Sequence, residues 1–175
     1  MPITLYDAFV PSCQQILGGM RGIVDKAESH AKANGLDASD LIEASLAEDM
    51  WPLPWHVRAC FVHSSYALGL VPTGEFTPDF TVRPNDWDSM RSMIDETLDG
   101  LQKVSPDDLE AISDDHVFFV LGGKRLMEFK VSNFLLSFSQ PNFYFHATTF
   151  YDILRKQGVA LSKRDYTGVP RAIGL

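Results

Sequence analysis

Asparagine, histidine and threonine share one face of the last predicted helix, and their side chains are the first in this sequence that could do chemistry together. The stretch Pro141–Val159 (PNFYFHATTFYDILRKQGV) has a helical period and places Asn142, His146 and Thr149 at spacings of four and three. Two histidines one turn apart are a common way to hold a divalent metal on a helix. Here the first position is Asn, whose amide oxygen is a weak ligand for zinc. The pattern therefore indicates either an incomplete metal site or a core histidine that hydrogen-bonds across the interior.

A second set of polar residues lies on the helix predicted from Pro54 to about Leu70. His56, Cys60 and His63 are spaced four and then three, so they share a face. His56 and His63 span two full turns, about 10.5 Å, and one metal ion cannot bind both without ligands from elsewhere. His63 with His146 is therefore the more plausible pair across two helices. Cys60 is interpreted as a packed small hydrophobe, since a nucleophilic role needs a lowered thiol pKa.

Aromatic residues are abundant near these polar groups, namely Trp51, Trp55, Phe143, Tyr144, Phe145 and Tyr151. Ligand pockets are typically apolar with a few placed polar groups, so this composition is compatible with a site for a small amphipathic molecule. The alternative is that the aromatic side chains belong to the core or to an interface.

The elements that must position these residues are mainly helices. Apolar residues at spacings of three and four predict long helices over about Leu5–Asn34 and Asn85–Val104, besides the two already named. A shorter helix is expected within Asp37–Ala47, and the tail Leu161–Leu175 is expected to be irregular. Gly18, Gly19 and Gly22 lie inside the first helix, where a close neighbour or a local bend would explain them.

A β-hairpin is predicted before the last helix. Val117–Leu121 is rich in β-branched and aromatic residues, and Gly122-Gly123 separates it from Lys124–Lys130. A lone hairpin is marginal in water, so it must lie against the helices or pair with a second chain. The predicted architecture is an all-α single domain over residues 1–175, with four nearly antiparallel helices and this small hairpin.

Composition excludes several classes of function. The formal net charge is −8 and Lys and Arg form no block, so no nucleic-acid partner is expected. No run of about 18 apolar residues could span a membrane. The opening MPITLYDAF does not resemble a secretory signal, and two cysteines make no disulfide framework. These features favour a cytoplasmic protein with reduced thiols.

The passages MPITLYDAF, MWPLPWHV and NFYFHATTFYDILRKQGVALSKRDYTG resemble an uncharacterised, domain-of-unknown-function branch of the DinB/YfiT-like superfamily. The resemblance covers nearly the whole chain and implies a four-helix bundle with up-down-down-up topology, often dimeric. Metal-binding members hold zinc or nickel with one histidine on the second helix and two on the last, and some act on low-molecular-weight thiol conjugates. His63 and His146 match two of those positions, whereas Asn142 stands where the family has its third histidine.

Three functions are therefore expected, each from a different class. The first is a metal-dependent hydrolase or thiol-conjugate transferase with a reduced zinc or nickel site at His63, His146 and Asn142. The second is a metal-free protein that binds a small molecule, and the third is a structural homodimer joined through the hairpin. The pocket in the first two cases is expected to include His56, Cys60, Thr149, Trp55 and Tyr144.

Overall fold

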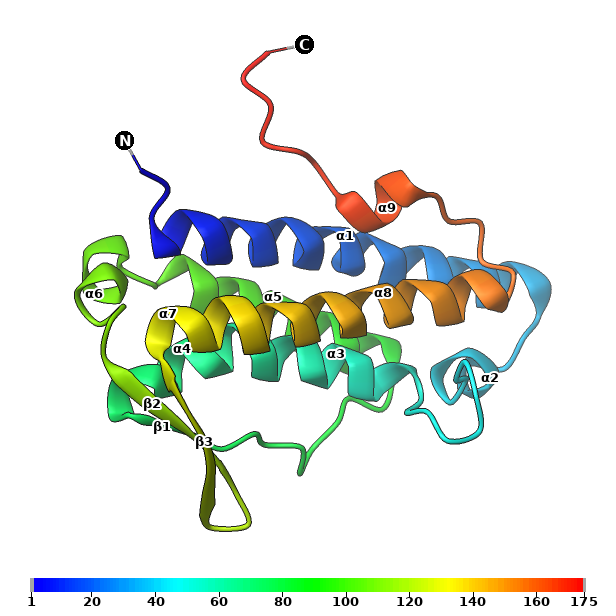
Figure 1. The fold of residues 1–175 in the computed structure, drawn as a ribbon. Helices are drawn as coiled ribbons and strands as arrows, with labels where there is room; N and C mark the ends of the chain where they lie inside the picture. Colours follow the sequence, from blue (N-terminus) through cyan, green and yellow to red (C-terminus); the bar gives the residue numbers. More distant parts are fainter. Residues whose placement is uncertain (1, 175) are drawn as a thin grey trace.

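The computed structural model describes residues 2–174 and is mostly helical, with one small sheet (Figure 1). Met1 and Leu175, which the predicted domain and tail include, lie outside the described residues. Within the described part, no helix is both long and apolar enough to cross a membrane.

The first helix, α1, spans Leu5–Asn34, as its apolar stripe predicts. Thr4 caps it by accepting a hydrogen bond from the backbone N–H of Asp7, and Gly35 ends it with a left-handed φ of 64°. Its buried face includes Phe9, Cys13 and Met20. The sequence therefore sets both ends of this helix through ordinary capping chemistry.

The second long helical segment runs from Leu53 to Leu70 and contains a wider turn. It consists of α3 (Leu53–Phe61), a π-helical turn η1 (Val62–Tyr66) and α4 (Ala67–Leu70). A short helix α2 (Ala38–Ile42) precedes it, and a 3₁₀ turn η2 (Val71–Thr73) follows. Wide π turns hold one extra residue and are frequent at functional sites, so the position of His63 in η1 is notable.

The last long segment also contains a wide turn. The chain is helical without a break through α7 (Val131–Asn133), the π-helical η3 (Phe134–Ser139) and α8 (Gln140–Lys156). Pro141 stands in the first turn of α8, where its missing N–H is tolerated. The helical segment therefore continues past this proline to Lys156.

Four long segments lie side by side around one core. α1 packs against α5 (Trp87–Gln102) and α8, and α3 packs against the same two helices. The chain runs in one direction through α1 and α8 and in the opposite direction through α3–α4 and α5 (Figure 1). α5 begins at an Asp86–Ser89 capping box, and α6 (Pro106–Ala111) follows it.

The long connection before α5 returns along the length of the helices (Figure 1) and is fastened to α3. The nearly buried Arg58 donates from Nε to the carbonyl oxygen of Asp79 at 2.8 Å and pairs with its carboxylate at 2.7 Å. Because the guanidinium can make both contacts at once, it fixes the connection with little freedom. This connection carries Phe80, which packs on Trp51 and Trp55 beside the histidines described below.

A three-stranded sheet closes one end of the helices. β2 (His116–Leu121) and β3 (Lys124–Lys130) are antiparallel and joined by Gly122 and Gly123, both with positive φ as this tight turn requires. The third strand, β1 (Glu75–Phe76), pairs parallel with β2. The hairpin thus receives a partner strand from its own chain, which the proline-rich loop sequence did not predict.

A short helix in the tail covers the middle of α1, where the sequence analysis wrongly predicted irregular chain. α9 (Lys163–Thr167) starts at a capping box of Ser162 and Asp165. A Cβ at Gly19 would lie 2.6 Å from the carbonyl oxygens of Asp165 and Tyr166, so only glycine permits this approach. Cβ atoms at Gly18 and Gly22 would meet nothing within 4 Å. The close-neighbour explanation therefore holds for Gly19 and not for the other two glycines.

Candidate functional site

Two histidines from facing helices form a hydrogen-bonded pair. His56 on α3 and His146 on α8 approach through their Nδ1 atoms at 3.0 Å, and both rings are buried. The Nε2 atom of His56 lies 3.1 Å from the carbonyl oxygen of Trp51. The loop before α3, α3 itself and α8 therefore meet at one chain of polar contacts.

The carbonyl of Trp51 determines which atoms donate and which accept along this chain of hydrogen bonds. A carbonyl oxygen only accepts, so Nε2 of His56 carries the proton. In the neutral ring, Nδ1 of His56 is then the acceptor, and Nδ1–H of His146 donates to it. His146 is left with an unprotonated Nε2, which has no hydrogen-bond partner among the described residues and is not sealed from solvent.

His63 lies on the other side of His146. The two rings are almost parallel, at an interplanar angle of 7°, with centroids 6.3 Å apart. Phe76 and Phe138 pack against His63 at 6.1 and 5.9 Å. Its Nδ1 is buried and has no hydrogen-bond partner in the described part of the chain. The lone pair or proton on this atom is therefore uncompensated, an arrangement that costs free energy whichever tautomer the ring adopts.

All three rings are kept uncharged by their surroundings. Burial lowers the pKa of His63 to about 4. Burial lowers the pKa of His146 to about 3, and the nearby rings of His56 and His63 add to this because a positive charge on His146 would be repelled by one on either of them. Burial also lowers the pKa of His56, although the hydrogen bond to the Trp51 carbonyl partly opposes it. Neutral imidazoles can accept hydrogen bonds or bind metals, so the protonation states leave both functions open.

The side chains do not fit the tightly held metal ion that the superfamily resemblance implies. A metal-bound histidine almost always donates its other ring N–H to a partner. His146 has such a partner in His56, but metal binding through Nε2 of His63 would leave an N–H on its unpartnered Nδ1. Asn142 donates its amide to the carbonyl oxygen of Phe138 at 2.8 Å and supplies no third ligating nitrogen.

Other side chains near the histidines do not complete a metal site either. Within residues 2–174, no group of three or more His, Cys, Asp or Glu side chains is placed to hold a metal ion. A tetrahedral ion bonded to His63 and His146 at about 2.1 Å would also draw the ring centroids to about 5 Å, closer than they lie.

A shallow hollow of about 280 Å³ opens beside the histidine pair. We call it the histidine hollow; it is lined by Asp49, Met50, Trp51, His56, Phe145 and His146. The Trp51 ring stacks on His146 at 5.8 Å, and the side chains of Trp51 and Phe145 are 41% and 55% exposed. Exposed aromatic faces beside an imidazole acceptor are typical of a binding surface rather than of a finished core.

A second hollow of about 530 Å³ continues from the first along α8, and Met50 and Phe145 line both. Thr148 and Thr149 line this part, and their hydroxyls are already donated to the Tyr166 hydroxyl and the Phe145 carbonyl. The carboxylate of Asp152 lies at the same wall. The lining therefore offers hydrogen-bond acceptors and a carboxylate, whereas the hydroxyls of its two threonines are already used as donors.

The other predicted pocket residues are spread around the site. Thr149 and Tyr144 line the second hollow, and the ring of Trp55 lies 5.8 Å from that of Trp51, between centroids, without lining either hollow. Cys60 is fully buried and donates to the carbonyl oxygen of Phe143 at 3.7 Å, and burial raises its thiol pKa. Cys60 is therefore a core residue, in agreement with the interpretation as a packed hydrophobe, and it does not line either hollow.

The contact between His56 and His146 was not predicted, because His56 and His63 lie two turns apart and His63 was preferred as the partner of His146. Phe145 was named among the aromatic residues near the polar groups, whereas Asp49 and Met50 were not singled out. The sequence carried one usable signal, since Met50 and Trp51 precede Pro52 and Pro54, which stand where the chain enters α3. A chain entering a helix at this point must place its last side chains over the first turn, where His56 lies.

Comparisons with known proteins agree on the type of protein. The family described as "Domain of unknown function (DUF1993)" matches residues 5–167. A crystal structure of a DinB family member from Shewanella denitrificans is similar, with a TM-score of 0.78 and 27% sequence identity over 98% of this chain and 96% of that chain. No curated protein matches this sequence. With a match across almost its whole length and a DinB-like structural neighbour, the chain belongs to the DUF1993 family.

Proposed function

We propose that the protein binds a small amphipathic amine in the histidine hollow without a metal ion. The observation that carries this proposal is the acceptor nitrogen of His146, which the hydrogen-bond chain from the Trp51 carbonyl leaves unprotonated beside exposed aromatic rings. An ammonium group donates hydrogen bonds and accepts none, so it complements this atom.

Two further features support a cationic ligand. The carboxylates of Asp49 and Asp152 lie at the two hollows, and no lysine or arginine lines either of them. The faces of Trp51 and Phe145 attract cations through their ring quadrupoles. The net charge of −8 also favours the approach of a positively charged molecule.

The resemblance-based expectation of a metal-dependent hydrolase or thiol-conjugate transferase has weaker support. Such a site needs a third ligand and a hydrogen-bond partner behind each ligating ring. Asn142 and His63 do not supply them. We therefore place substrate recognition, and not metal chemistry, at the centre of the proposal.

We further infer that the four long segments form the up-down-down-up bundle of the DinB-like fold. The ring of contacts among α1, α5, α3 and α8 and the chain directions in Figure 1 support this topology. The same bundle places His56 and His63 on one helix and His146 on its neighbour, so the histidine hollow follows from the topology.

Binding of phenethylamine tests the proposal, with phenethyl alcohol and 3-phenylpropionate as matched probes of the same apolar body. In chelator-treated protein, the amine should raise the melting temperature in a saturable way, whereas the alcohol and the acid should not. His146→Phe removes the acceptor and should abolish the shift.

His116→Gln, on the exposed hairpin away from both hollows, is the matched control and should keep the shift. Equal stabilisation by all three probes would show that only apolar contact operates. Stabilisation by zinc or nickel, lost in both His63→Phe and His146→Phe, would replace the proposal with a metal site.

A further inference from the structure

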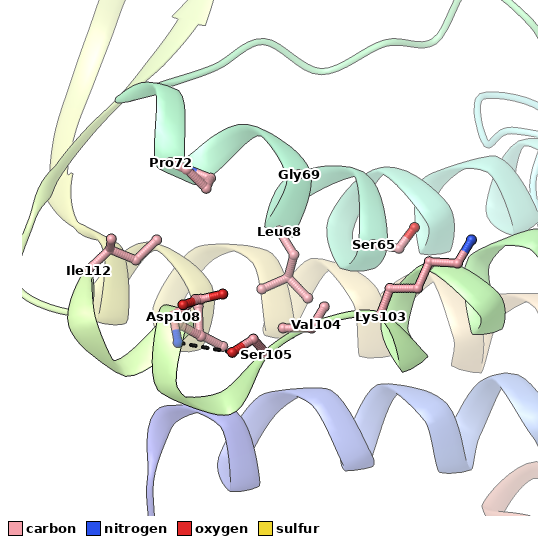
Figure 2. A pocket seen from close by; sticks show the side chains of 11 residues that line it. Ser65, Leu68, Gly69, Pro72, Lys103, Val104, Ser105, Asp108 and Ile112 are labelled. Carbon is pink, nitrogen blue, oxygen red and sulfur yellow. Dashed lines mark hydrogen bonds between the residues drawn. The ribbon is translucent and has the colours of Figure 1, made fainter.

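A separate cavity of about 250 Å³ lies at the other end of the second helical segment, between α4, the end of α5 and α6 (Figure 2). It shares no lining residue with the two hollows at the histidines. Its walls are mainly apolar and include Leu68, Val104 and Ile112. An apolar cavity with few polar groups is the usual form of a site for a small molecule.

Two glycines create this space. At Gly100 on α5, a Cβ would lie 3.0 Å from both Cβ and Oγ of Ser65, so glycine lets α5 approach the second segment closely. At Gly69 on α4, a Cβ would meet no atom within 4 Å, although Gly69 lines the cavity. The wall at Gly69 is therefore open, and a side chain there would occupy volume that is otherwise available to a ligand.

The positive and the negative side chain of the cavity lie on opposite sides. The ammonium of Lys103 and the hydroxyl of Ser65 lie on one side, and Asp108 and Ser105 lie on the other (Figure 2). Lys103 is the single cation of the lining, and its side chain makes no ion pair with another described residue. The hydroxyl of Ser65 also makes no hydrogen bond within the described chain. Two donors on one side are thus free to bind an anion.

We propose that this cavity binds a small monocarboxylic acid with a branched apolar body. Its carboxylate accepts hydrogen bonds from the Lys103 ammonium and the Ser65 hydroxyl, and its hydrocarbon lies against Leu68, Val104 and Ile112. Asp108 on the far side repels a second carboxylate, which excludes dicarboxylic acids. The cavity is smaller than the roughly 300–1,000 Å³ of sites for drug-sized ligands, so the ligand is short.

The site is independent of the histidine hollow, so it can be tested separately. The probe is 4-methylpentanoate, with 4-methylpentan-1-ol, 4-methylpentylamine and glutarate as matched compounds. In an NMR titration of backbone amides, the monocarboxylate should shift residues of α4, the α5 end and α6 in a saturable way. The alcohol should bind at least about tenfold more weakly, because it cannot form the charge-assisted bonds. Glutarate should bind no better than the alcohol.

Two variants identify the groups that bind. Lys103→Gln should weaken 4-methylpentanoate binding about tenfold, whereas Lys124→Gln on the hairpin turn removes an equal charge and should leave it unchanged. Gly69→Leu should fill the cavity and abolish binding. Gly18→Leu, at another helical glycine with open space around its Cβ, is the control for helix substitution and should bind as wild type does.

Several results would overturn the assignment. These are tighter binding of the amine than of the acid, unchanged affinity in Lys103→Gln, retained binding in a folded Gly69→Leu protein, or amide shifts that cluster at His146 instead. Absence of any saturable shift with the monocarboxylate would also reject it. A circular-dichroism melting curve for each variant confirms that it is folded before its affinity is compared.

Discussion

Replacing His63 with phenylalanine should make the folded protein less sensitive to acid. His63 is buried, its Nδ1 has no partner, and burial lowers its pKa from the usual 6.5 to about 4. Because the folded-state pKa is the lower one, the unfolded chain takes up a proton first as pH falls. The stability that the neutral ring contributes is complete above about pH 6.5 and is lost progressively as pH falls toward about 4.

The size of the effect follows from these two pKa values. Between about pH 7.5 and pH 5, proton uptake at His63 in the unfolded state lowers the free energy of unfolding by about 2 kcal/mol. The unfolded state of His63→Phe has no histidine to take up a proton at this position, so the free energy of unfolding of the variant relative to wild type should rise by about 2 kcal/mol from pH 7.5 to pH 5. Phe76 and Phe138 already surround the ring, which makes phenylalanine a suitable replacement.

Urea unfolding followed by circular dichroism at several pH values measures this difference. Phe138→Leu is the control, because it changes the packing around His63 without removing a titratable group and should shift stability equally at all pH values. A chelator in every sample keeps metal ions out of the comparison. If wild type and His63→Phe lose stability in parallel from pH 7.5 to pH 5, the argument that His63 is held neutral by burial is wrong.

Three other predictions address the metal, the glycines and the hairpin. Protein purified without a histidine tag should contain less than about a tenth of an equivalent of zinc or nickel by elemental analysis, because the donor set lacks a third ligand; an equivalent that survives dialysis would contradict this. Gly19→Ala should destabilise the protein by about 1–3 kcal/mol, since its Cβ meets the carbonyl oxygens of Asp165 and Tyr166 at 2.6 Å. Gly18→Ala should instead stabilise it by up to about 1 kcal/mol. If thermal denaturation shows that the two substitutions change the stability in the same direction, both predictions are refuted. If the exposed apolar side chains of β3 join two copies, light scattering should give twice the 19.6 kDa chain mass, and Met127→Glu should halve it.

The long helices could be predicted because their signals are local. The bounds Leu5–Asn34 follow from one apolar stripe, a threonine cap and a terminal glycine, and the structure confirms them. The third predicted helix, Asn85–Val104, is shorter by about two residues at each end, since Asp86 caps it and the chain turns at Lys103. Helix ends fray and overlap with their caps, so differences of this size are expected.

The two elements that were not predicted from the sequence, β1 and α9, depend on contacts that a local sequence pattern does not contain. β1 has only two residues and exists because β2 lies beside it. α9 is one turn long and is held by the space above Gly19 and by the ion pair between Lys26 and Asp165. Neither segment is long enough to show a period, so tertiary packing decides its structure.

The candidate site was predicted in part for the same reason. The pairing of the second helix with the last through histidines was expected, and His63 does stack on His146. The hydrogen-bonded partner of His146 is nevertheless His56, which lies in the regular helix α3, whereas His63 lies in the π turn at Val62–Tyr66. A strict helical period does not describe a segment that contains such a turn.

The two π turns also bear on how the length of this chain can vary. Each one accommodates a surplus residue while the helix on either side remains anchored by its own buried side chains. Loss of a single residue within Phe134–Ser139 would therefore tighten that segment into regular α-helix and leave His146 aimed at His56. Loss of a residue within Ala147–Leu154 has no such reserve and would rotate everything beyond it by about 100°. Relatives one residue shorter in the wide turns are thus compatible with the same interior, and those shortened elsewhere in these helices are not.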